Sequence, residues 1–130
     1  MTCDRGSVSA AVVLLTGTML AGAALVLDGG RILATRREAA GLAMAAARVG
    51  AHEADMRAGP SPQVDPGRAD RAARALLSGT GARVAVAVAG DRVTVTVALT
   101  TDRVLPGPGG PTEVRAVRTA RLIPSEEPTP

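Results

Sequence analysis

The chain has 130 residues, a formal net charge of +3 and no Phe, Tyr or Trp. Its basic residues are all arginines, and acidic residues are interspersed with them along the sequence. Because no aromatic side chain is present to stack on a base and the charges are mixed, the composition argues against a nucleic-acid-binding protein.

An uncharged run from Val8 to Leu27 follows a short charged leader, residues 1–7. At about 1.5 Å rise per residue, a helix over this run reaches roughly the 30 Å thickness of the hydrocarbon layer of a bilayer. Hydroxyl groups within it can bond back to helix carbonyls, namely those of Ser9, Thr16 and Thr18. We therefore predict a transmembrane helix over residues 8–27 and a single-pass protein of the cell membrane.

Helical character continues beyond the run, since alanines and aliphatic residues recur every three or four positions. We predict that residues 28–58 form a projecting alanine-rich helix that continues the transmembrane helix. Gly29 and Gly30 each weaken a helix by up to about 1 kcal/mol relative to Ala, which allows a bend there. Residues 59–67 are rich in Pro and Gly and predict a linker.

Asp65 and Pro66 predict the start of a short helix that continues over Arg68–Ser78. Three arginines at helical spacing line one of its faces: Arg68, Arg71 and Arg74. The plainer interpretation is a solvent-exposed face. The alternative is contact with anionic lipid headgroups, because the segment follows the anchor closely in the sequence.

Two alternating segments, Ala82–Ala89 and Arg92–Leu99, flank Gly90-Asp91 and predict a β-hairpin. Threonines give the second strand one polar face. The first strand is apolar on both faces, so we expect it to lie centrally in the sheet or to be covered by a helix. Glu113–Ile123 predicts a third strand.

Together these segments predict an α+β fold, in which a long N-terminal membrane-spanning helix extends outward and precedes a small antiparallel β-meander with a short helix. The exported α+β domain covers residues 68–123, and residues 124–130 form a polar tail that we expect to be disordered. A core without aromatic side chains buries less apolar area per residue. We therefore expect this domain to rely on a partner, on self-association or on the membrane.

The residues of common catalytic and metal sites are scarce. His52 is the only histidine and Cys3 the only cysteine, so one chain can form neither a zinc site of usual composition nor an intrachain disulfide. The segment from His52 to Met56 lacks the second histidine of the zinc-protease helix, and the glycine-rich loop Pro106–Pro111 lacks the Lys-Ser/Thr of a phosphate loop. We predict no enzymatic activity, no cofactor and no small-molecule substrate.

The flanks of the apolar run resemble those of the TadE/TadG-like proteins of the tight-adherence (Flp-type) pilus system. In that family a charged leader with Arg-Gly-Ser precedes the membrane helix, and an Asp-x-Gly-Arg element and an alanine-rich helix follow it. The corresponding residues are Arg5-Gly6-Ser7, then Asp28, Gly30 and Arg31, and then Ala39–Ala51. The resemblance implies a type IV pilin-like minor subunit or assembly factor that acts structurally through helix packing. Its implied partners are membrane lipid and other pilin-like or pilus-assembly membrane proteins.

The resemblance also implies prepilin-type processing between Gly6 and Ser7. Pilin-like members carry a Glu five residues after the cleavage glycine, and Ala11 stands at that position here. A carboxylate inside lipid is costly and is tolerated when it pairs with a neighbour's terminal amine during assembly. Its absence favours a permanently anchored accessory role over that of a shaft subunit.

Charge and resemblance disagree on topology. Arg31, Arg36 and Arg37 after the run outnumber Arg5 before it, so the positive-inside rule places the C-terminal side in the cytoplasm. The family implies the reverse orientation. We follow the family and expect an extracytoplasmic C-terminal domain.

Two other classes of protein remain open. One is a secreted protein whose signal peptide is cleaved near Ala21-Gly22-Ala23, although the apolar run continues to Leu27. The other is a membrane-tethered protein-binding module that recruits an extended segment along the edge of the Val84–Leu99 hairpin.

Overall fold

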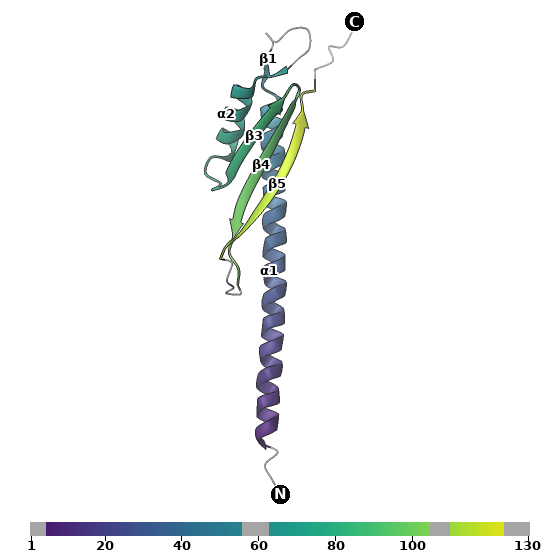
Figure 1. Cartoon of the computed structure of the whole chain (residues 1–130), viewed down its shortest axis with the longest axis vertical. Helices are drawn as coiled ribbons and strands as arrows, with labels where there is room; N and C mark the ends of the chain where they lie inside the picture. Colours follow the sequence, from purple (N-terminus) through teal and green to yellow (C-terminus); the bar gives the residue numbers. More distant parts are fainter. Residues whose placement is uncertain (1–4, 56–62, 105–109, 124–130) are drawn as a thin grey trace.

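The computed structural model describes residues 5–55, 63–104 and 110–123 (Figure 1). A long N-terminal helix carries a three-stranded antiparallel sheet and a second helix along its C-terminal half, which confirms the predicted α+β fold. The elements are α1 (Arg5–Ala51), β1 (Ala54–Asp55), β2 (Gln63–Val64), α2 (Pro66–Leu77), β3 (Arg83–Ala89), β4 (Arg92–Thr101) and β5 (Thr112–Arg121).

Helix α1 is continuous through Gly29 and Gly30, so the bend that these glycines allow does not interrupt it. It ends at Ala51, several residues before the predicted limit at residue 58, which was wrong. The last turn is closed by the amides of His52 and Glu53, which donate to carbonyls of Val49 and Gly50 at 3.2 Å. The chain then forms the short strand β1, which pairs with β2 inside the predicted linker.

Helix α2 begins as predicted at Asp65 and Pro66. The Asp65 carboxylate accepts the amide of Arg68 at 2.9 Å, and Pro66 occupies the first turn, where its missing N–H leaves no bond unmade. The helix ends at Leu77, with Ser78 as its C-cap. Its buried residues recur four positions apart, which directs one face to the core: Ala69, Ala73 and Leu77.

The sheet has the order β3-β4-β5, the predicted meander. Ala89 pairs with Arg92 across the two-residue turn, and Gly90 takes a positive φ of 62°, which glycine adopts without strain. The central strand is β4, whereas β3 lies at one edge and is contacted by α2. Of the two positions expected for the first strand, central or covered by a helix, the second is the one observed. The alanines of β3 face outward and are exposed, while its valines are half-buried on the side that α2 contacts.

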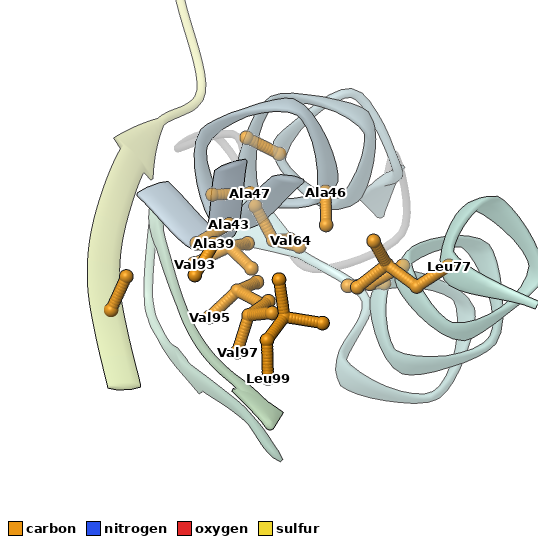
Figure 2. Packing of buried hydrophobic residues seen from close by; sticks show 14 residues of the cluster. Ala39, Ala43, Ala46, Ala47, Val64, Leu77, Val93, Val95, Val97 and Leu99 are labelled. Atoms are coloured by element: carbon orange, nitrogen blue, oxygen red, sulfur yellow. The ribbon is translucent and has the colours of Figure 1, made fainter. Parts of the chain in front are cut away.

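Both helices cover the same face of the sheet, with the core between them (Figure 2). Three valines of β4 are fully buried: Val93, Val95 and Val97. They meet a stripe of alanines on α1 that are buried at spacings of three and four residues: Ala39, Ala43, Ala46, Ala47 and Ala51. Gly50 belongs to the same face, and a Cβ added there would lie 3.1 Å from Cγ1 of Val93. Small residues therefore let the helix approach the sheet closely.

Several sequence predictions fall outside the described residues. These are the disordered tail at residues 124–130, Cys3, and most of the glycine-rich loop.

Candidate functional surface on the long helix

The N-terminal half of α1 extends beyond the sheet and is covered by none of the described elements (Figure 1). From Val8 to Leu27 every residue is exposed except Ala24, which is half-buried. The large aliphatic side chains here are 57–75% exposed, Val26 being the most exposed. An 18-residue window of this helix has a mean hydropathy of 2.2 and no buried share, so its length and composition suffice to cross a membrane.

Polar groups in this half are few and can be satisfied locally. The hydroxyl of Thr18 donates to the carbonyls of Leu14 and Leu15, at 3.1 and 2.8 Å, as predicted. At Gly17 and Gly22, an added Cβ would meet no atom of another element within 4 Å, so their small surfaces face outward. We call residues 8–27 the bare half of α1. It is an apolar helix whose backbone is least covered by side chains at Gly17 and Gly22.

The residues of the predicted processing site, Gly6 and Ser7, lie in the first turn of α1. Processing between them stays a prediction. The three residues of the predicted element after the anchor have different environments and do not form one site. Asp28 is buried, whereas Gly30 and Arg31 are exposed.

Asp28 is 8% exposed and binds the connection between β4 and β5. Its Oδ1 accepts the backbone amide of Val104 at 2.6 Å, a contact between residues 76 positions apart in the sequence. Next to Val104, Nε of Arg103 donates to Oγ1 of Thr112 at 2.7 Å and so joins the two sides of the connection. The first residue after the apolar run therefore attaches the sheet to the helix.

Sequence reasoning missed this contact between Asp28 and Val104. The only local signal is the acidic residue at the end of the apolar run. It indicates where the membrane-spanning segment ends, but not which group the carboxylate binds. The segment after Thr101 has no pattern that directs it to a helix. Only the length of β4 and β5 brings it to the level of Asp28.

The arginines of α2 lie at the far end of the domain. Ala69 of α2 lies next to Gly50 of α1, since a Cβ added at Gly50 would be 3.5 Å from the Cβ of Ala69. Gly50 is about 35 Å along α1 from Leu27. Arg74 bonds Asp70 at 2.9 Å, and Nε of Arg71 donates to the carbonyl of Gly67 at 3.1 Å. The three arginines are exposed, which agrees with the plainer interpretation of a solvent-exposed face. Because α2 packs beside the last turns of α1 and not beside the apolar run, its position gives no support to the headgroup alternative.

Several other charged side chains form ion pairs on the surface of the domain. Arg83 bonds Glu113 at 3.0 Å, between the two edge strands. Arg121 donates to the carboxylate of Asp91 and thereby lowers the pKa of that group below its usual value. The amide of Arg68 does the same for Asp65, lowering its pKa. The pair of Arg83 and Glu113 borders an open depression on the sheet, which Thr96 and Arg115 also line.

His52 lies exposed after the last turn of α1, beside Arg48 and Arg121. Within residues 5–55, 63–104 and 110–123, no three His, Cys, Asp or Glu side chains gather closely enough to hold a metal ion.

Comparisons with protein-family models, with curated proteins and with solved structures found no match to this chain.

Proposed function

We propose that this protein is a membrane-anchored, pilin-like minor subunit or assembly factor of a tight-adherence (Flp-type) pilus or a related secretion machine. The observation that carries the proposal is the division of α1. Residues 8–27 form a bare apolar rod, while the same helix holds a folded domain on its other half. In a subunit that works through helix packing in a membrane, such a helix would carry both the anchor and the exported domain.

The bare half also supports packing against other helices. Gly17 and Gly22 leave the helix backbone accessible, and small residues permit the close approach by which membrane helices associate. Ala11, where pilin-like proteins carry Glu, favours an accessory subunit that stays in the membrane. We expect the C-terminal domain to lie on the extracytoplasmic side of the membrane.

Deletion of the gene in its native host tests the role directly. Loss of surface pili or of pilus-dependent adherence is expected, and unchanged piliation would contradict the proposal. A sharper test complements the deletion with Gly17→Leu, which blocks close helix approach, and with Val13→Leu, which enlarges a side chain that is already 70% exposed. We expect Gly17→Leu to fail and Val13→Leu to restore piliation.

The N-terminus of the mature protein separates this proposal from the secretory alternative. A start at Ser7 indicates prepilin-type processing, and a start at Met1 or Thr2 indicates an unprocessed anchor. A start near Ala24 would remove the bare half and contradict membrane anchoring altogether.

A protein-binding module is the second candidate, and the position of β3 favours it. An edge strand offers backbone groups to an added strand, and β3 is an edge strand of the sheet. One such group is already used, because Nη1 of Arg74 donates to the carbonyl of Val84 at 3.4 Å. A proline at Val86 should abolish capture of an extended partner if this edge is the binding site.

A further inference from the structure

Val104, in the described part of the connection between β4 and β5, lies at the level where the apolar run of α1 ends. The Val104 amide bonds Asp28, which directly follows Leu27. The lower ends of β4 and β5 accordingly lie beside the middle of α1, far from α2 (Figure 1). If residues 8–27 occupy the hydrocarbon layer, Val104 lies in the headgroup layer, which is roughly 5–8 Å deep on each side.

The side chains at this level suit a lipid surface. Val104 is apolar and 41% exposed. Arg103 and Arg31 are exposed, and Arg31 is three residues beyond Asp28, about 5 Å along the helix axis. None of the ion pairs between described side chains includes either arginine. Nε of Arg103 is used by Thr112, so we assign phosphate binding to its two Nη groups and to the guanidinium group of Arg31, because arginine binds phosphate oxygens in a bidentate manner.

From this juxtaposition we propose that the first residues of the β4–β5 connection, Asp102–Val104, dock on the membrane surface, where Arg31 and Arg103 bind the phosphates of anionic lipids and Val104 contacts the acyl boundary. The inference rests on the membrane anchoring of the proposed function and not on its role in a pilus. Asp28 is the positioning residue, since its bond to Val104 holds the connection against α1. The domain is then attached to the membrane at two points, the helix and this connection, which restricts its tilt.

Site-specific fluorescence tests the position of the connection. In the full-length protein with Cys3→Ser, an environment-sensitive dye is placed at Val104→Cys and, for comparison, at Leu20→Cys and Ala89→Cys. Ala89 is exposed at the opposite end of the sheet, next to the hairpin turn. The protein is reconstituted in vesicles of phosphatidylcholine with a minority of phosphatidylglycerol, and quenchers attached to the lipids are added.

We expect quenching of the dyes at positions 20 and 104 and none at position 89. Quenching at position 20 alone would overturn the docking proposal and leave the anchor intact. A dye at position 20 that stays in water would overturn the anchor itself, and with it the docking proposal. The two failures are thereby distinguished.

Lipid selectivity tests the arginines. Spin-labelled phosphatidylglycerol and phosphatidylcholine report which lipid is immobilised around the protein. We expect Arg31→Gln with Arg103→Gln to lower the preference for phosphatidylglycerol, by up to about fivefold for each arginine. The matched control, Arg48→Gln with Arg68→Gln, removes the same charge from the distal end and should leave the preference unchanged. An unchanged preference in the first variant, or an equal fall in the control, would overturn the assignment.

Discussion

The two halves of α1 are both apolar, yet they use opposite kinds of side chain. Between Val8 and Leu27 the helix exposes large aliphatic groups around its whole circumference. Between Ala39 and Ala51 it buries a stripe of alanines, and its larger residues such as Val49 stay partly exposed. The packed half thus gains stability from close approach to the sheet. The bare half exposes apolar surface that an apolar solvent such as lipid can cover.

This difference shows that hydrophobic content alone does not tell how a helix is used. A helix that packs on a protein needs a periodic stripe, because only one face meets the partner. A helix in lipid meets an apolar medium on every side and needs no period. Substitutions matched between the two halves should therefore have opposite or unequal consequences.

The largest expected effect is a charge in the bare half. Leu20→Arg places a guanidinium near the centre of the apolar run, which costs about 2.5–3.5 kcal/mol of insertion free energy. We expect a marked loss of the protein from the membrane fraction in carbonate extraction. Ala45→Arg adds the same group to an exposed position of the packed half and should leave extraction unchanged. Equal behaviour of the two variants would contradict the division of the helix.

Added bulk should distinguish the halves in the reverse direction. Ala43 is fully buried against the sheet, so Ala43→Leu forces the helix and β4 apart and should lower the free energy of unfolding by about 1–3 kcal/mol. Ala23→Leu enlarges an exposed residue of the bare half and should not change it. Urea unfolding of the full chain in detergent micelles, followed by circular dichroism of the sheet, measures both. A silent Ala43→Leu would mean that the stripe does not pack as described.

The border between the halves depends on Asp28. Asp28→Ala leaves the Val104 amide without its acceptor and should lower the free energy of unfolding by about 1 kcal/mol. Asp28→Asn keeps an oxygen at the position of Oδ1 and should recover most of the loss. Protection of the Val104 amide from hydrogen exchange gives a local measurement. If that protection is the same in Asp28→Ala, the bond does not hold the connection.

Two glycines of the packed half should respond differently to the same substitution. Gly41 has open space around a Cβ, so Gly41→Ala should raise the free energy of unfolding by up to about 1 kcal/mol. At Gly50 an added Cβ meets Cγ1 of Val93 at 3.1 Å, and this contact should cancel or reverse the gain. The difference between the two midpoints in urea measures the closeness of helix and sheet. Equal stabilisation by both substitutions would show that β4 moves aside freely.

Most of the fold could be predicted because its signals are local. The apolar run, the Asp65-Pro66 cap and the Gly90-Asp91 turn each determine a short segment through backbone geometry or side-chain period. The end of α1 at Ala51 was missed because residues 52–57 retain helical composition, and the pairing of β1 with β2 is a contact between separate segments.

The apolar faces of β3 left two positions open, central or covered by a helix, since alternation predicts a strand but not its neighbours. The position of α2 and the Asp28–Val104 bond depend on how strands of a certain length fold back along a helix. Proximity in the sequence was misleading for the α2 arginines, because β1, β2 and α2 follow the distal end of α1. The level of each loop along α1 becomes visible only in three dimensions.

The smallest expected effect is a dependence on pH that we expect of the folded domain and not of the bare half of α1. Hydrogen bonding to Arg121 lowers the pKa of Asp91 in the folded protein below the ordinary value of 3.8. The unfolded chain therefore binds a proton first as the pH falls, so this pair stabilises the domain above pH 3.8 and its contribution is lost as the pH falls toward the pKa of the folded state. Because both side chains are partly exposed, the loss of stability should be modest.

Asp91→Asn removes the titrating group, so the unfolding midpoint of this variant should fall less steeply with acid than that of the unchanged protein. Residues 8–27 contain no titratable side chain, so membrane extraction should not change over the same range. If the unfolding midpoints of Asp91→Asn and of the unchanged protein fall equally with acid, Asp91 contributes nothing. An acid-dependent release from the membrane would show that the stability of the domain affects the anchoring of the bare half.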